Sequence, residues 1–356
     1  MAPADDDISI EEKRVYAGTS GRTDAYLAAD VGVVRVAISD DIVGEFDLAT
    51  REPARDVAIL PAGIGHDQDG GRTDGTEPAD EFERPDGDER HVLLAVATDD
   101  DLKLAPLEPD PASTGELTFV DAGVGSTVAV GTHDGGFLVA GADGTISHVA
   151  EVGTVDSGAA GSDVSSRSTG ADGPTPNALI ADRLGDVPDP RAVDGPLIAA
   201  ADGVHRAASR GGSRTVERVG LDDVRDVAGG GIPLAATPDG LYWLGNGWMD
   251  AIDGDFDVVA ADGRGHAMAG GEGSLWVRHG DPTGDEASGS AGWGVDAWSR
   301  AELPVDAQIA ALGYGPGLSV AVTGTGAVCV DVGGGWRHRT VGVAGVSGVA
   351  LTPIDD

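Results

Sequence analysis

Lysine and cysteine are almost missing from this chain of 356 residues, and aromatic residues make up only 4% of it. The single cysteine, Cys329, excludes an internal disulfide and stands in an apolar run, so we expect a buried small side chain rather than a reactive thiol. No apolar run reaches the length of a transmembrane helix, and the first residues lack the basic and apolar regions of a secretory signal. The sequence therefore predicts a soluble protein of the cytoplasm.

Positively charged residues are also few in this sequence. Lys and Arg number 23 against 61 Asp and Glu, which gives a formal net charge of -38, and the lysines are Lys13 and Lys103 alone. Carboxylates hold water and cations at molar salt, whereas the long apolar stem of lysine is poorly hydrated there, so we interpret the composition as adaptation to an extremely saline cytosol. The net negative charge would also repel nucleic-acid phosphates, and we expect no nucleic-acid partner.

Long helical stripes are also absent. Short apolar runs rich in Val, Leu and Ala alternate with Gly, Asp and Pro, which is typical of strands joined by tight turns. The apolar content of 40% is enough to form a core. We therefore expect an all-β fold.

A recurring unit of small apolar strand, Asp-Gly-like turn and second apolar strand predicts a repeated β-hairpin. Glycine at such turns tolerates positive φ, and small strand residues suit a crowded layer near a central axis. Seven copies lie at residues 25–36, 93–104, 128–139, 196–206, 233–244, 267–277 and 318–330.

Further strands flank these hairpins. The tetrapeptide RDVA precedes two of them, at residues 55–58 and 225–228, and outer strands are expected at 214–219 and 336–341. Four strands per unit predict a single seven-bladed β-propeller, with six or eight blades as alternatives. Residues 346–353 resemble an inner strand whose partners begin the chain, at residues 15–17 and 26–28, so strands from both termini are expected to close the ring.

Low-complexity stretches explain the uneven spacing of the repeats. They lie near residues 64–90, 153–176 and 279–292, are rich in Gly, Ser, Pro or acidic residues, and are too polar to form a core. We expect them to be loop insertions between repeat units within one domain spanning residues 1–356. Residues 1–12 are expected to form a flexible N-terminus.

Three segments carry a resemblance to known proteins: KRVYAG at residues 13–18, GVVRV at 32–36 and RDVA at 55–58. Together with the repeats and the acidic composition, they make the whole chain similar to an uncharacterised family of haloarchaeal β-propeller proteins. The resemblance implies a propeller fold. It assigns no activity and no functional residue.

Motifs for catalysis or cofactor binding are not found in the sequence. The eight histidines show no metal-ligand spacing, and neither a nucleophile elbow nor a phosphate-binding glycine loop occurs, so we predict no catalytic residue, no cofactor and no metal ligand. Residues 250–257 offer four aspartates of the kind that bind Ca²⁺, but they depart from the EF-hand pattern. A solvated turn and a cation site remain the two interpretations of this run.

Seven residues are candidates for binding. The innermost strands of a propeller line a channel, so Arg55, Asp56, Arg225 and Asp226 are predicted either to bind a ligand or partner there or to form a structural Arg/Asp network. All six tryptophans fall between residues 243 and 336. Trp243 and Trp276 are expected at equivalent positions in the packing between blades, whereas the candidates for partner binding are the loop tryptophans Trp248, Trp293 and Trp298.

These observations favour a non-catalytic protein-interaction scaffold, expected to be a monomer, with a protein partner and no contact with membranes. Two alternatives from other classes stay open. One is a cation-dependent hydrolase or lyase acting at the channel, and the other is a sensor of a small molecule or glycan.

Overall fold

The computed structural model describes residues 22–61, 92–107, 117–152, 178–210, 213–278 and 292–353. Within these ranges the chain is almost entirely β-strand, and the sole helix is the short 3-10 turn η1 (Val295–Ala297). The ranges contain no helix of the length and apolarity needed to cross a membrane.

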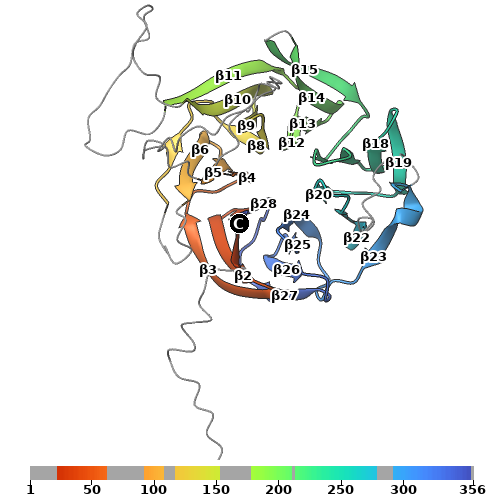
Figure 1. The fold of residues 1–356 in the computed structure, drawn as a ribbon. Coiled ribbons are helices and arrows are strands. Elements are labelled where there is room, and N and C mark those ends of the chain that lie inside the picture. The colour runs from red at the N-terminus through yellow and green to blue at the C-terminus, as the bar shows by residue number, and fades with distance from the viewer. Residues whose placement is uncertain are drawn as a thin grey trace, which may run out of the picture.

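Seven four-stranded antiparallel sheets are arranged around a common centre (Figure 1). Each sheet is one blade, and the strand named first is the innermost. The blades are blade 1, β28 (Gly348–Leu351), β1 (Arg22–Ala29), β2 (Gly32–Ser39) and β3 (Ile42–Thr50); blade 2, β4 (Asp56–Leu60), β5 (Val92–Ala97), β6 (Leu102–Leu107) and β7 (Val120–Asp121); blade 3, β8 (Thr127–His133), β9 (Gly136–Gly141), β10 (Thr145–Val152) and β11 (Ala178–Asp186); and blade 4, β12 (Pro190–Asp194), β13 (Leu197–Ala200), β14 (Gly203–Arg210) and β15 (Ser213–Gly220).

The other three blades have the same order from the centre outward. They are blade 5, β16 (Asp226–Ala228), β17 (Leu234–Ala236), β18 (Gly240–Leu244) and β19 (Trp248–Asp253); blade 6, β20 (Val258–Ala261), β21 (Ala267–Gly271), β22 (Ser274–Arg278) and β23 (Trp298–Ala301); and blade 7, β24 (Ile309–Gly315), β25 (Leu318–Thr323), β26 (Ala327–Asp331) and β27 (Arg337–Thr340). The predicted propeller with seven blades of four strands is confirmed.

Strands from the two ends of the chain share blade 1. The C-terminal strand β28 pairs antiparallel with β1, with Tyr26 opposite Ala350 and Leu27 opposite Val349. This pairing confirms the predicted closure and covers the inner edge of β1, which would otherwise be open to another strand. The first predicted partner, residues 15–17, lies outside the described residues.

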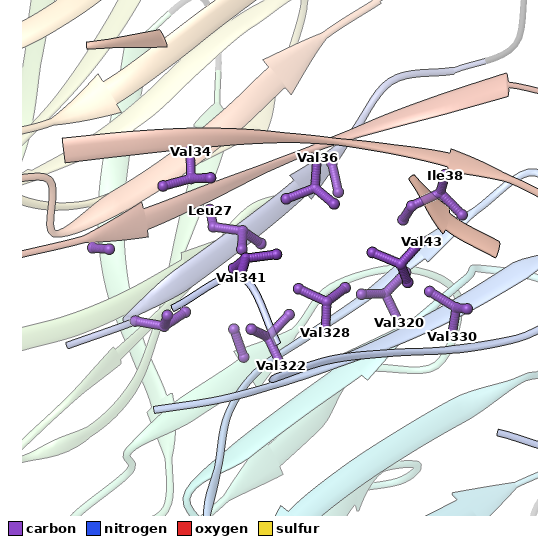
Figure 2. Close-up of a cluster of buried hydrophobic side chains, with 14 of the residues drawn as sticks. Leu27, Val34, Val36, Ile38, Val43, Val320, Val322, Val328, Val330 and Val341 are labelled. Atoms are coloured by element: carbon purple, nitrogen blue, oxygen red, sulfur yellow. The ribbon is translucent and has the colours of Figure 1, made fainter. Parts of the chain in front are cut away.

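Apolar side chains fill the seam between blade 1 and blade 7 (Figure 2). Leu27 on β1 and Val36 on β2 face Val320 on β25 and Val328 on β26. All four side chains are fully buried. Burial of such side chains stabilises a fold by about 1.5–3 kcal/mol each. The seam is therefore closed by packing as well as by the pairing of β28 with β1.

Small residues and glycine turns give the middle strands their form. Strands β13, β17 and β21 are buried along their whole length and are rich in alanine or glycine, which suits their place between an inner strand and the rest of the blade. At the β13–β14 turn, Gly203 has φ of +126°, and a Cβ there would overlap the carbonyl group of Leu221. Cys329 on β26 is buried as predicted, and burial raises the pKa of its thiol to about 11.

One of the seven predicted hairpins is out of register. Six of them coincide with the two middle strands of a blade, but residues 128–139 form β8 and β9, the inner pair of blade 3. The middle pair of that blade is β9 and β10, whose turn contains Gly144 with φ of +89°. The Asp134–Gly135 turn resembles the turns of the other hairpins, so the turn signal alone selected the wrong strand pair.

The three low-complexity stretches are also placed differently from the expectation. Residues 64–90, 153–176 and 279–291 lie outside the described residues, but the strands that flank them belong to one sheet in each case. The pairs are β4 with β5, β10 with β11, and β22 with β23. The stretches therefore interrupt blades 2, 3 and 6 instead of separating repeat units.

Candidate functional site

A cavity of about 1170 Å³ lies at the centre of the ring. Each of the seven inner strands contributes residues to its wall, so it is the channel of the propeller. Arg55, Asp56, Arg225 and Asp226 all border it. The two RDVA segments begin inner strands β4 and β16, which explains why their charged residues face the channel.

Asp56 and Asp226 each connect the inner strand of one blade to that of the next. Asp56 on β4 accepts a hydrogen bond at Oδ2 from the amide of Val130 on β8, at 2.9 Å. Asp226 on β16 accepts one at Oδ2 from the amide of Val259 on β20, at 2.8 Å. The second oxygen of each carboxylate accepts the amide of the following residue. The repeated tetrapeptide therefore marks a repeated contact between blades.

Two further residues of the channel wall were not found from the sequence. Asp194, at the end of β12, accepts a hydrogen bond from the amide of Gly229 in blade 5 at 2.6 Å. Arg191 on the same strand pairs with Asp223 at 2.7 Å, just before blade 5 begins. Neither residue belongs to an RDVA segment, so no repeated sequence signal pointed to them.

Burial raises the pKa of both Asp56 and Asp226 to about 7 and also raises the pKa of Asp194. The amide donors act in the opposite direction because they stabilise the charged carboxylate, while neighbouring channel carboxylates add to the rise for Asp56 and Asp226. Protein surrounds all three side chains, yet each keeps part of its surface open to the channel. The charge of the channel wall therefore changes near neutral pH.

The two predicted arginines do not pair with the aspartates beside them in the sequence. Arg55 forms an ion pair with Asp99 at the β5–β6 turn. Arg225 pairs with Asp255 and, at 2.6 Å, with Asp257, both of which precede inner strand β20 of blade 6. An Arg/Asp network is thus present at the channel, but with other partners than adjacent residues, because each carboxylate of an RDVA segment binds backbone amides.

The ion pairs of Arg225 use two of the four aspartates of residues 250–257, for which a cation site was one interpretation. Asp255 and Asp257 are engaged by Arg225. In the part of the chain that the structure describes, no three His, Cys, Asp or Glu side chains come close enough together to hold a metal ion.

The three loop tryptophans do not border the channel. Trp293 and Trp298 are 8% and 6% exposed and pack edge to face between blades 5 and 6, with ring centroids 6.5 Å apart. Trp248 on β19 is half-buried and donates a hydrogen bond from Nε1 to the carbonyl oxygen of Val219 in blade 4, at 3.1 Å. All three contribute to packing between blades, and Trp293 and Trp298 offer a partner little exposed ring surface.

The two tryptophans predicted to pack between blades do so. Trp243 and Trp276 lie in the same cluster between blades 5 and 6 and approach it from opposite blades. Their positions are not equivalent, because Leu241 corresponds to Leu275 in the two hairpins and Tyr242 therefore corresponds to Trp276. The packing prediction is confirmed, and the equivalence is wrong by one residue.

A second cavity, of about 250 Å³, lies between blades 6 and 7 and shares part of its wall with the channel. Strands β21, β22 and β23 form one side, and β24, β25 and β26 form the other. The two cavities adjoin along this shared wall, and we name the region that they border the blade 6–7 groove. It includes the shared His266, Tyr314, Ser319 and Asp331, with Arg264 on the channel side and Trp336 on the outer side.

Two arginines of blade 6 form no ion pair with the described residues, and Arg264 is the one that borders the groove. Arg264 and Arg300 are exposed, and neither forms an ion pair within the described ranges. The guanidinium group of Arg300 lies 5.0 Å from the ring centroid of Trp276, which packs in the cluster between blades 5 and 6, so this charge lies on the face of blade 6 that is turned away from blade 7.

Two carboxylates of the groove wall already have hydrogen-bond partners. Asp262 accepts a hydrogen bond from Nδ1 of His266 at 2.6 Å. Asp331 accepts the amides of Gly333 and Gly335 at 2.8 and 2.9 Å. Glu302, at the outer end, is the carboxylate of the groove for which the described residues provide no partner.

Uncommitted hydrogen-bond donors remain in the shared wall and on the outer side of the groove. The hydroxyl of Tyr314 and Nε1 of Trp336 form no hydrogen bond with any described residue. Burial, reinforced by the negative charge of Asp262, raises the pKa of Tyr314 far above its usual value, so the hydroxyl keeps its proton. The clustering of tryptophan after residue 243 was the sequence signal for this region, although it directed attention to buried rings instead of Trp336.

Several solved structures show partial similarity to this chain at low sequence identity. The solved structure of a computationally designed protein, Ika8, is 13% identical, with 94% of this chain and 88% of that chain covered and a TM-score of 0.47. YCF48 bound to D1 peptide is 14% identical over 76% of this chain and 91% of that one, with a TM-score of 0.45. Chaetomium thermophilum Sqt1, bound to the N-terminus of ribosomal protein L10, is 16% identical over 72% and 73%, with a TM-score of 0.43.

The search of curated proteins found no match. The family described as HVO_0234-like, beta propeller, matches residues 9–84 and 86–352, which is nearly the whole chain. This match agrees with the resemblance to haloarchaeal propellers inferred from the sequence. The chain belongs to the HVO_0234-like β-propeller family.

Proposed function

We propose that this protein is a non-catalytic interaction scaffold that binds a protein partner in a saline cytosol. The observation that carries the proposal is the blade 6–7 groove, in which the channel and the cleft between two blades join through four shared residues. A depression of this form offers a partner a rigid, concave surface, because its walls are strands of two packed blades.

The composition of the groove suits recognition of a protein. Tyr314, Trp336 and Arg264 belong to the residue types that contribute most binding energy at protein interfaces. Aromatic rings provide a large contact area at low entropic cost, and their unbonded polar atoms are free to bind a partner. The high negative charge of the whole chain supports a setting of molar salt, where it is screened.

Affinity purification at molar KCl tests the proposal with matched variants. Tagged wild type, Arg264→Glu, Trp336→Ala and Arg51→Glu are each recovered from cells grown at high salt. Arg51 is the control, since it is also exposed and unpaired within the described ranges but does not border the groove. We expect one stoichiometric partner with the wild type and Arg51→Glu, and its loss or strong reduction with both groove variants.

Two results would contradict the proposal. Recovery of no stoichiometric partner with the wild type would argue against a scaffold. Equal recovery of the partner with all four proteins would place the interface away from the groove.

A further inference from the structure

We infer that the smaller cavity between blades 6 and 7 binds a single neutral sugar ring. The inference goes beyond the scaffold function and does not depend on it, because the site lies within this chain and needs no partner. Three features of the cavity support it: a row of polar side chains on the wall of blade 7, an apolar wall on blade 6, and a volume of about 250 Å³.

The polar row crosses three strands of blade 7. Tyr314 on β24 lies opposite Ser319 on β25, and Ser319 lies opposite Asp331 on β26. The neighbours of Ser319 and Asp331 along these strands pack in the seam with blade 1, so by alternation these two side chains face blade 6. Tyr314 and Trp336 pack in the cluster between blades 6 and 7. All four residues border the cavity.

Each member of the row keeps a group that can bind a ligand. The hydroxyls of Tyr314 and Ser319 and Nε1 of Trp336 form no hydrogen bond with any described residue. Asp331 accepts two backbone amides of the following turn at Oδ1, and no described residue donates to its Oδ2. Because strand pairing fixes three of these side chains next to one another, the row offers donors and an acceptor at set positions.

The wall of blade 6 is apolar where it meets the cavity. Val277 and Ala301 are half-buried, belong to the cluster between blades 6 and 7, and border the cavity. The guanidinium groups of Arg278 and Arg300 lie over tryptophan rings of the cluster between blades 5 and 6, so they point away from it. A ligand therefore meets aromatic rings and polar groups on one side and aliphatic surface on the other.

The polar groups around the cavity favour a neutral ligand over an ion. An anion would meet the free oxygen of Asp331 and the exposed carboxylate of Glu302. A cation has no acceptor for Nε1 of Trp336, and a donor that loses water without gaining a partner costs free energy. A hydroxyl group both donates and accepts, so a neutral ligand with several hydroxyls can satisfy the whole row.

The size and the aromatic rings select a sugar ring among neutral ligands. The cavity has the volume of about eight water molecules, which suits one six-membered ring with its hydroxyls. The C–H face of such a ring is apolar and packs against the ring of Trp336 or Tyr314, while the hydroxyls at its edge reach the polar row. The ring is a free sugar or the end unit of a sugar chain.

The probes are the methyl glycosides of glucose, galactose and mannose. Saturation-transfer difference NMR measures their binding to the purified full chain in molar KCl and shows which ligand protons touch the protein. We expect at least one glycoside to bind, with transfer strongest to the protons of one ring face. Matched glycosides with a carboxylate or an ammonium group at the sixth carbon should bind at least about fivefold more weakly.

Variants locate the binding site. Tyr314→Phe and Ser319→Ala each remove one hydroxyl and should each weaken binding by about two- to tenfold, which is the effect of one neutral hydrogen bond. Trp336→Ala should abolish binding. Tyr242→Phe is the control, since the hydroxyl of this half-buried tyrosine in blade 5 also lacks a partner among the described residues but does not border the cavity. The thermal midpoint of each variant establishes that it is folded.

A disaccharide that ends in the bound hexose distinguishes the two sources of the ring. Tighter binding of the disaccharide than of the methyl glycoside indicates the end unit of a sugar chain. Equal or weaker binding indicates a free sugar.

Three results would overturn the inference. The first is no saturation transfer to any of the three glycosides. The second is transfer to the charged glycosides as strong as to the neutral ones. The third is binding that Tyr314→Phe and Ser319→Ala leave unchanged. These measurements use the purified chain alone, so the scaffold function is decided separately, by copurification with Arg264→Glu and Trp336→Ala.

Discussion

At the scale of single residues, the channel aspartates show how a charged group serves a closed ring. Asp56, Asp194 and Asp226 each accept a backbone amide from the following blade, so each carboxylate fixes the distance between two inner strands. A buried hydrogen bond to a charged group contributes about 1.5–3 kcal/mol. The cost is the desolvation of the carboxylate, which is why the pKa of Asp56 and of Asp226 is raised to about 7.

Asp226→Asn should flatten the dependence of stability on pH. The folded protein holds the Asp226 proton up to about pH 7, whereas the unfolded side chain ionises near pH 4, so the folded state binds more protons in between. The free energy of unfolding of the wild type therefore falls as pH rises through this window, by up to about 1.4 kcal/mol per pH unit for this group. Urea unfolding at constant KCl measures the slope.

The Asp226→Asn variant also loses one of the two oxygens that accept backbone amides. Its free energy of unfolding should therefore be lower than that of the wild type by about 1–3 kcal/mol. Asp296→Asn, at an exposed position, is the control and should leave the slope unchanged. A slope identical in wild type and Asp226→Asn would show that Asp226 ionises in the same way in the folded and unfolded chain.

Residue positions on the channel could be read from the sequence, but residue partners could not. Asp56 and Asp226 are the first residues of inner strands β4 and β16, Arg55 and Arg225 immediately precede them, and all four border the channel. Their partners come from other turns and other blades, and sequence proximity gives no information on which blade is adjacent in space. The groove was missed for the same reason, since it exists only where blades 6 and 7 meet.

At the scale of strands, the turn chemistry determined most of the pattern and caused its one register error. Gly203 marks a turn between middle strands, as predicted, but Gly135 has φ of +72° at a turn between the two inner strands of blade 3. Both turns satisfy the same local rule, so only the count of strands in the finished blade distinguishes them. Local signals therefore define hairpins better than they define the place of a hairpin in a blade.

Shortening either long low-complexity stretch should leave the ring folded. Leu60 lies opposite Leu93, and Val152 lies opposite Ala178, so each gap joins neighbouring strand ends that a short turn can connect. We expect replacement of residues 64–90 or 153–176 by a Gly-Ser turn to change the free energy of unfolding by no more than about 1 kcal/mol, because loop closure depends weakly on length.

Circular dichroism and size-exclusion chromatography check this expectation. A spectrum and elution volume like those of the intact chain agree with it. Loss of the folded state in either deletion would mean that the removed residues pack against the blades and are needed for the fold.

At the scale of the whole molecule, closure of the ring stabilises the fold and repulsion between carboxylates destabilises it. The seam between blades 1 and 7 and the strand β28 hold the ends of the ring together, while a formal charge of -38 repels itself within one compact body. The closure was predictable because a terminal strand without a hairpin has to pair somewhere. The number of blades followed once the repeat was counted.

The thermal midpoint should rise by several degrees from low to molar KCl, because salt screens the repulsion between carboxylates. Differential scanning calorimetry across a KCl series measures the midpoint, and NaCl at the same ionic strength separates screening from an effect of the cation. A midpoint independent of salt would contradict the interpretation of the acidic composition as adaptation to high salt.

Hydrogen exchange with and without the copurified partner tests most directly that the blade 6–7 groove is the binding surface. The account predicts slower exchange, on binding, of the amides around His266, Tyr314 and Trp336, with little change in blades 2 to 4. Protection confined to blades 2 to 4, or to outer strands such as β3 and β11, would contradict it.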